Sequence, residues 1–217
     1  MTMMCLSLSH RFVPAEALEK LAVPAAELGA VLARLHALPG VDEAVVLSTC
    51  NRVEVYAAVS GPAGPVAAAV AGLLAARGNL QADEVIRMAR NLLGGAAAEH
   101  LFSVACGLDS MAVGEDQVVA QVKAAARAAA AARTAGPAVT GLIDAALAAS
   151  KRARTQTTIS TEGISLARAG LDIAAARPDV LARVHGDPHL HHVRLAFTRL
   201  FHDHNCVGAF RDRKSVV

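Results

Sequence analysis

The chain has 217 residues, of which 54% are apolar and 18% are charged, a composition that excludes disorder throughout. It also excludes an integral membrane protein, because Arg127 and Arg133 interrupt the alanine-rich run around residues 124–132 and no apolar stretch reaches the length of a membrane helix. A net charge of +2 is too small for a general nucleic-acid binder, so we expect any contact with RNA to be local and no binding of DNA.

The N-terminus and the cysteines point to the cytoplasm. Residues 3–8 are apolar over too short a stretch for a secretory signal, and no basic segment precedes them. The cysteines are widely scattered and form no C-x-x-C pair, which is typical of a reducing compartment. The chain has four of them: Cys5, Cys50, Cys106 and Cys206.

The first third of the chain alternates predicted strands and helices. Proline near the start of two segments is typical of a first helical turn, and β-branched or alternating runs predict strands. The predicted strands are residues 4–9, 43–47 and 52–56, and the predicted helices are 14–21, 24–38 and 66–76. The last helix is expected to end near Gly78-Asn79, which suit a left-handed cap.

The middle of the chain is predicted to be helical. The expected helices are residues 96–105, 115–133, 138–154 and 163–176, with a break at Gly136-Pro137. Six of the nine histidines fall in an unusual tail beyond Pro178. The predicted class is α+β: a small N-terminal sheet with packed helices, ferredoxin-like, followed by a helical subdomain.

Cys50 is the most conspicuous candidate for chemistry. It lies between two predicted strands, in Ser48-Thr49-Cys50-Asn51-Arg52. A guanidinium and backbone N–H groups lower the pKa of a nearby thiol and so favour a nucleophilic thiolate. An inert packing role is the alternative, and it suits Cys5 and Cys106 better because both lie in apolar runs.

Other polar groups allow both a functional and a structural interpretation. His100 could act as acid or base toward Cys50, or be a partly exposed helix residue. Gln117 and Gln121 lie at i and i+4, so they could bind a polar ligand or be solvated. The basic cluster Lys151-Arg152-Ala153-Arg154 could bind phosphates, or be a solvated charge run at a helix end that suits the helix dipole. The spacing of the tail histidines matches no metal site, so no metal is expected.

Five ordered segments resemble the glutamyl-tRNA reductase family, which begins the five-carbon route to tetrapyrroles (porphyrins). They are LSLSHR at 6–11, VVLSTCNRVEVY at 45–56, AEHLF at 98–102, GLDSMAVGEDQ at 107–117 with QVK at 121–123, and KRART at 151–155. The resemblance implies an N-terminal catalytic domain over residues 1–157 and the start of a connecting spinal helix over 158–180. An atypical histidine-rich tail follows over 181–217, for which disorder is one alternative.

The resemblance implies a thioester mechanism. Cys50 attacks the ester of glutamyl-tRNA, and NADPH reduces the resulting thioester to glutamate-1-semialdehyde. His100 would assist catalysis, and Arg52 would hold the substrate carboxylate bidentately. The full set of implied substrate-binding residues is Thr49, Asn51, Arg52, Ser110, Glu115, Asp116, Gln117 and Gln121.

The family's nicotinamide-binding domain is not visible in the sequence. No G-x-G-x-x-G follows a predicted strand after Ala176, and the 41 residues from 177 to 217 are few for such a domain. We therefore expect no cofactor-binding residues here, and three alternatives remain. The first is an enzyme whose reduction is lost or is completed by a partner, either a full-length reductase or another protein that supplies NADPH. The second is a glutamyl-tRNA-binding or regulatory module, and the third is an inactive truncation. The resemblance also implies a homodimer, as in the full-length family.

Overall fold

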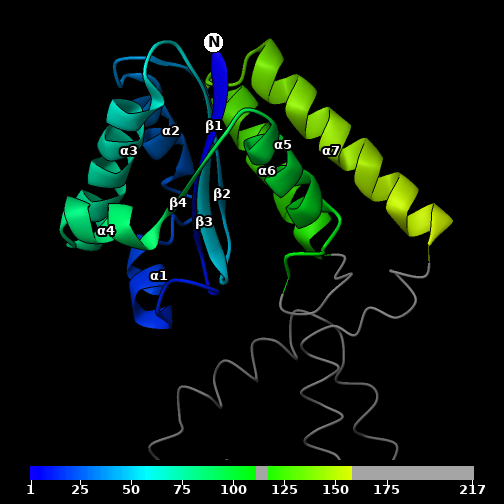
Figure 1. Cartoon of the computed structure of the whole chain (residues 1–217), viewed down its shortest axis with the longest axis horizontal. Helices are drawn as coiled ribbons and strands as arrows, with labels where there is room; N and C mark the ends of the chain where they lie inside the picture. The colour runs from blue at the N-terminus through cyan, green and yellow to red at the C-terminus, as the bar shows by residue number, and fades with distance from the viewer. Residues whose placement is uncertain (111–116, 158–217) are drawn as a thin grey trace, which may run out of the picture. The chain divides into compact units, whose positions relative to one another are not determined.

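The structure, a computed structural model, describes residues 1–110 and 117–157, and within these residues the strands form one antiparallel sheet of four (Figure 1). The strands are β1 (Thr2–Ser9), β2 (Val41–Ser48), β3 (Arg52–Val59) and β4 (Arg90–Leu93), in the order β2-β3-β1-β4. All eight residues of the central strand β3 are buried. A strand buried along its whole length requires cover on both faces of the sheet.

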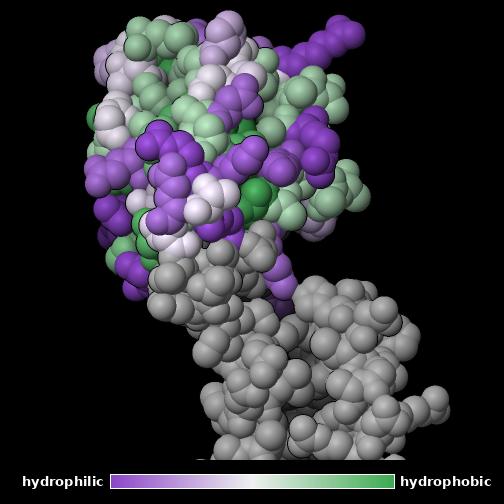
Figure 2. All heavy atoms as spheres, turned by 90° about the vertical axis from the view of Figure 1, so that its right-hand side faces the viewer, coloured by the Kyte–Doolittle hydropathy of each residue, from purple (hydrophilic) through white to green (hydrophobic). Residues whose placement is uncertain are grey.

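Helices supply that cover on both sides (Figure 1). On one face lie α1, α2 and α3, with α4 packed against α3, and on the other face lie α5, α6 and α7. Their bounds are α1 Ala15–Leu21, α2 Leu28–His36, α3 Ala63–Gly78, α4 Ala82–Met88, α5 Gly95–Ala105, α6 Gln117–Ala131 and α7 Pro137–Gln156. Figure 2 shows the side of the molecule where α7 lies, and there hydrophilic side chains lie among hydrophobic ones.

A single apolar core fills the space between these layers. It combines large side chains of the sheet, such as Met4, Leu6 and Tyr56, with alanine-rich helices. Small residues let backbones approach closely, and Gly78 shows this, since a Cβ there would lie 3.1 Å from the Lys20 carbonyl oxygen of α1. The helix of Gly78 ends at Asn79 with φ 52° and ψ 45°, which confirms the predicted left-handed cap.

The predicted α+β class is confirmed, and the ferredoxin-like detail stays a prediction. The structure adds that the helices predicted as a following subdomain, α5 to α7, share the core of the sheet. It also contains α4 and β4, which the sequence patterns did not predict. The predicted helix 163–176, the spinal-helix start at 158–180 and the tail at 181–217 lie outside the described residues.

None of the helices in the described residues is by itself long and apolar enough to cross a membrane. Taken together, α3 and α4 are long and apolar enough by length and composition alone, but the chain bends by 113° between these two helices.

Candidate active site

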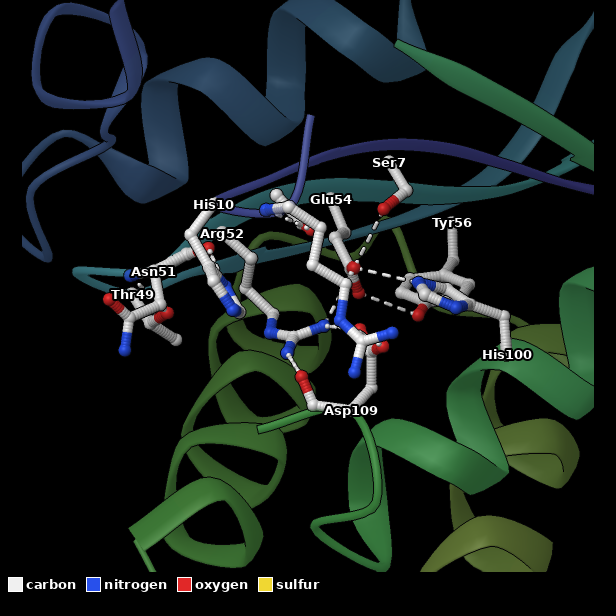
Figure 3. A network of polar contacts seen from close by, with 11 residues as sticks. Ser7, His10, Thr49, Asn51, Arg52, Glu54, Tyr56, His100 and Asp109 are labelled. Carbon is white, nitrogen blue, oxygen red and sulfur yellow. Dashed lines mark hydrogen bonds and ion pairs between the residues drawn. The ribbon is translucent and has the colours of Figure 1, made fainter. Parts of the chain in front are cut away.

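A row of polar side chains runs across the sheet face that α5 to α7 cover. Residues of β3 alternate between the two faces, so Arg52, Glu54 and Tyr56 lie on the same side. The antiparallel register sets Ser7 of β1 directly opposite Glu54, and Ser9 opposite Arg52. In Figure 3 the side chains of Ser7, Arg52, Glu54 and Tyr56 lie between the strands and the helices. The row is therefore a polar site inside a largely apolar core.

Glu54 is the centre of this row. Its side chain is fully buried, and Oε1 accepts hydrogen bonds from Ser7 Oγ at 2.9 Å and Arg52 Nη1 at 3.1 Å. The Tyr56 hydroxyl donates to Oε2 at 2.7 Å, and His100 Nε2 lies 2.7 Å from Oε1 (Figure 3). Burial alone would raise the pKa of Glu54, but the hydrogen bond with His100 and the charge of Arg52 outweigh it and lower the pKa to about 2. The site therefore holds a buried carboxylate anion.

Arg52 joins Glu54 to the loop that follows α5. Its side chain is only 3% exposed; Nη1 also donates to Asp109 Oδ2 at 3.0 Å, and Nη2 donates to the Asp109 backbone oxygen at 2.6 Å. Burial alone would lower the pKa of Arg52, but Glu54 and Asp109 raise it above its ordinary value. Arg11 Nε reaches the other Asp109 oxygen at 3.3 Å. A substrate carboxylate on the Arg52 fork would have to replace Asp109.

Cys50 lies in the turn between β2 and β3. The turn is closed by Thr49 N–H donating to the Arg52 carbonyl at 2.8 Å and by Asn51 N–H donating to Thr49 Oγ1 at 3.2 Å. His10 N–H donates to the Asn51 carbonyl at 2.9 Å, which fixes the turn to the segment after β1. Cys50 is exposed at this position. The backbone therefore holds the thiol at the end of the sheet where a ligand can reach it.

The two other described thiols differ from Cys50. Cys5 and Cys106 are buried, and burial raises the pKa of both. A raised pKa keeps a thiol protonated and unreactive at neutral pH. This agrees with the packing role expected for them.

His100 extends from α5 onto the polar row. Its ring stacks on Tyr56, with 6.4 Å between centroids and 23° between planes, and its hydrogen bond goes to Glu54. Within residues 1–110 and 117–157, no hydrogen bond joins His100 to Cys50. The structure thus brings His100 together with Arg52 and Glu54, while Cys50 lies in the adjoining turn, two residues before Arg52.

The remaining predicted site residues lie after α5 and at the start of α6. Ser110 is partly buried and directly follows Asp109. Gln117 is the exposed first residue of α6, and Gln121 lies one turn later, partly buried. Glu115 and Asp116 lie outside the described residues.

The basic cluster predicted at 151–154 lies at the end of α7. Ser150 Oγ donates to the Ala105 carbonyl at 2.7 Å and so fixes this end of α7 to the end of α5. Lys151 and Arg152 are exposed there.

Sequence reasoning did not select Ser7, Arg11, Glu54, Tyr56 or Asp109 as site residues. The available signal was the alternation of polar and apolar residues along 52–56. It predicted a strand and gave no sign that the polar side is buried. In the described residues no group of three or more His, Cys, Asp and Glu side chains could hold a metal ion, and the tail histidines fall outside them.

Comparisons with known proteins agree on one family. The sequence model of the family described as the glutamyl-tRNAGlu reductase N-terminal domain matches residues 6–157. The chain is 39% identical over 188 residues to the glutamyl-tRNA reductase of Frankia alni, covering 87% of this chain and 40% of that one. It is 42% identical over 175 residues to that of Kineococcus radiotolerans, covering 81% and 39%. The structure of the Methanopyrus kandleri glutamyl-tRNA reductase superposes with a TM-score of 0.59 at 29% identity, covering 81% of this chain and 40% of that one. The chain therefore spans about 40% of the length of these relatives.

Proposed function

Since this chain belongs to the glutamyl-tRNA reductase family and carries its N-terminal domain, we propose that it performs the acyl-transfer step on glutamyl-tRNA, in the cytoplasm, at the start of tetrapyrrole synthesis. The observation that carries the proposal is the exposed Cys50 in a backbone-anchored turn beside the buried Arg52–Glu54–His100 cluster. Covalent catalysis uses a nucleophile and an acid–base group, and Cys50 and His100 are the residues that we assign to these two roles.

In this step the Cys50 thiolate attacks the carbonyl carbon of the ester that joins glutamate to the 3′ ribose of the tRNA. The C–S bond forms, the C–O bond breaks, and the ribose oxygen leaves with a proton as a hydroxyl. The product is a glutamyl thioester on Cys50. His100, with Nε2 held by Glu54, is the group that we assign to the proton transfer.

The substrate's amino acid needs groups that hold its charges. Arg52 supplies positive charge, and the polar groups around it are the proposed lining. They are Thr49, Asn51, Ser110, Glu115, Asp116, Gln117 and Gln121. Asp109 occupies the Arg52 fork in this structure, so binding of a carboxylate to Arg52 requires an exchange of partners.

The reduction that gives the family its name uses NADPH, and the described residues do not fit that cofactor. Dinucleotides bind where parallel strands meet glycine-rich turns, whereas the sheet formed by residues 1–110 is antiparallel throughout. The steps proposed for this chain therefore end at the thioester. The hydride would come from a full-length reductase that forms a dimer with this chain, or from another partner that supplies NADPH.

The experiment is to mix the chain with tRNA charged with labelled glutamate, without NADPH, and to quench in acid. We expect thiol-sensitive label on the wild-type chain, or faster release of glutamate, and neither with Cys50→Ser. Cys106→Ala is the matched control, since it removes a buried thiol and should leave the label unchanged. If the folded protein binds glutamyl-tRNA but shows no Cys50-dependent label, the acyl-transfer proposal is wrong and the chain is a binding module.

A further inference from the structure

An aromatic side chain with a guanidinium over its ring lies at the surface beside the candidate site. Phe12 is 48% exposed, and Cζ of Arg90 lies 5.4 Å from the centroid of its ring. Among the described residues only four large hydrophobic side chains are exposed, and two of them, Phe12 and Leu108, adjoin the members of the Arg11–Asp109 ion pair in sequence. Two of the four exposed apolar side chains are thus sequence neighbours of the ion pair at the candidate site.

The segment after β1 connects Phe12 to the turn that holds Cys50. Arg90 of β4 lies directly opposite Ser7, so it shares the sheet face of Ser7 and Glu54 and lies at its outer edge. Phe12 N–H donates to the Ser9 carbonyl at 2.9 Å, which folds the chain back just after β1. Two residues before Phe12, His10 is bonded to Asn51, the neighbour of Cys50. Two residues of chain span at most about 7 Å.

An exposed ring beside an arginine has the chemistry that binds single-stranded RNA. Nucleobases stack on aromatic faces and guanidinium planes, and arginine also attracts phosphate. The ester attacked by Cys50 joins glutamate to the last nucleoside of the tRNA, an adenosine, so its base must lie one nucleoside away from the thiol. Phe12 follows by two residues the His10 that bonds the Cys50 turn, and Arg90 lies over the Phe12 ring.

We propose that Phe12 and Arg90 form the seat of the terminal adenosine of the tRNA, an inference that rests on the proposed acyl transfer. The base stacks on the exposed part of the Phe12 ring, and Arg90 supplies positive charge to the adjoining phosphate. Correct placement of the nucleoside then brings the ester carbonyl to Cys50. The pair is a substrate-binding element outside the polar row described above.

The test measures dissociation constants of two uncharged tRNAs, one intact and one lacking only the terminal adenosine. Wild type should bind the intact tRNA about tenfold more tightly, the typical contribution of one stacked base. Phe12→Leu keeps an apolar side chain without a ring and should bind both tRNAs equally, whereas Phe12→Trp should preserve the preference. Leu93→Ala removes an exposed apolar side chain at the other end of β4 and is the control.

Arg90→Gln should weaken binding of both tRNAs and reduce the salt dependence of binding, because one phosphate contact is lost. The same preference in wild type and Phe12→Leu would overturn the proposal, as would no preference, or no tRNA binding, in folded wild type. NADPH competition that disappears in Phe12→Leu would also overturn it, since the seat would then serve a dinucleotide. The acyl-transfer proposal fails separately, through absence of Cys50-dependent label.

Discussion

The carboxylate of Glu54 lies 2.7 Å from the Nε2 atom of His100, inside the layer between the sheet and α5. Glu54 has no exposed surface, and Ser7, Arg52 and Tyr56 hold its two oxygens in place. A carboxylate that is held by several hydrogen bonds restricts the position of a histidine ring nitrogen that bonds to it. The orientation of His100 is therefore determined by the sheet as much as by its own helix.

This relationship predicts a pH-dependent loss of stability in Glu54→Gln. A pKa that falls from 4.5 to about 2 on folding corresponds to about 3 kcal/mol of stabilisation at neutral pH. Because the folded pKa is the lower one, this stabilisation is present above pH 4.5 and is lost as the pH falls toward 2. Wild type should thus exceed Glu54→Gln in free energy of unfolding by about 3 kcal/mol at neutral pH, and by progressively less in acid.

Urea unfolding at a series of pH values measures this difference. Glu16→Gln, an exposed carboxylate on α1, is the control, and its free energy of unfolding should follow that of wild type. A gap between wild type and Glu54→Gln that stays constant down to pH about 2 would refute the assignment of a low pKa to Glu54.

Tyr56→Phe should destabilise the chain by about 1.5 to 3 kcal/mol, the usual contribution of a hydrogen bond to a charged group. The substitution keeps the ring and its stacking on His100 but removes the donor that lies 2.7 Å from Glu54 Oε2. Thermal or urea unfolding measures the effect. Ser60→Ala removes an exposed hydroxyl that bonds Asp42, and its effect should be below about 0.5 kcal/mol. Equal losses of unfolding free energy in the two variants would show that the buried hydrogen bond stabilises the chain no more than an exposed one.

The elements around the site illustrate what the sequence can predict. β-branched runs and alternation located β2 and β3, and so located Cys50 between them, because these signals are local. The same alternation could not show that Glu54 and Tyr56 are buried. Their cover comes from α5 to α7, the first of which begins at Gly95, 39 residues after Tyr56. Burial of one face depends on such distant elements, and one strand's pattern does not report them.

The sequence patterns missed α4 and β4 for a different reason. Arg90 to Leu93 has four residues, none of them β-branched, and it pairs with one neighbour at the edge of the sheet. Its strand conformation comes from hydrogen bonds to β1 rather than from its own propensity. α4 has seven residues and buries only Val85, so it carries little amphipathic signal.

Under the proposed function, His100→Ala should slow Cys50-dependent glutamyl transfer by about 100-fold, the scale of one positioned acid–base group. The measurement is the single-turnover rate of label transfer at saturating glutamyl-tRNA, where binding does not limit the rate. His36→Ala removes an exposed histidine on α2 and should react as wild type does. An unchanged rate in folded His100→Ala would mean that another group moves the proton.

Glu43 of β2 caps the N-terminus of α7 from across the fold. Its buried carboxylate accepts hydrogen bonds from Ala138 N–H at 3.2 Å and from Val139 N–H at 2.7 Å. These are helix-terminal donors, which have no partner within their own helix. The carboxylate also lies at the positive end of the helix dipole. One side chain thereby ties the last described helix to the sheet.

Glu43→Ala should therefore destabilise the chain by about 2 kcal/mol, the upper range for loss of a helix cap. Glu43→Gln should cost less, because its amide oxygen can still accept one of the two bonds. Gly136→Ala should also destabilise, since a Cβ there would overlap the Glu43 carboxylate and force it off both donors. Asp144→Ala, exposed on the same helix, is the matched control for urea unfolding. If Glu43→Ala unfolds like Asp144→Ala, the cap does not stabilise α7 and the helix is held by its apolar face alone.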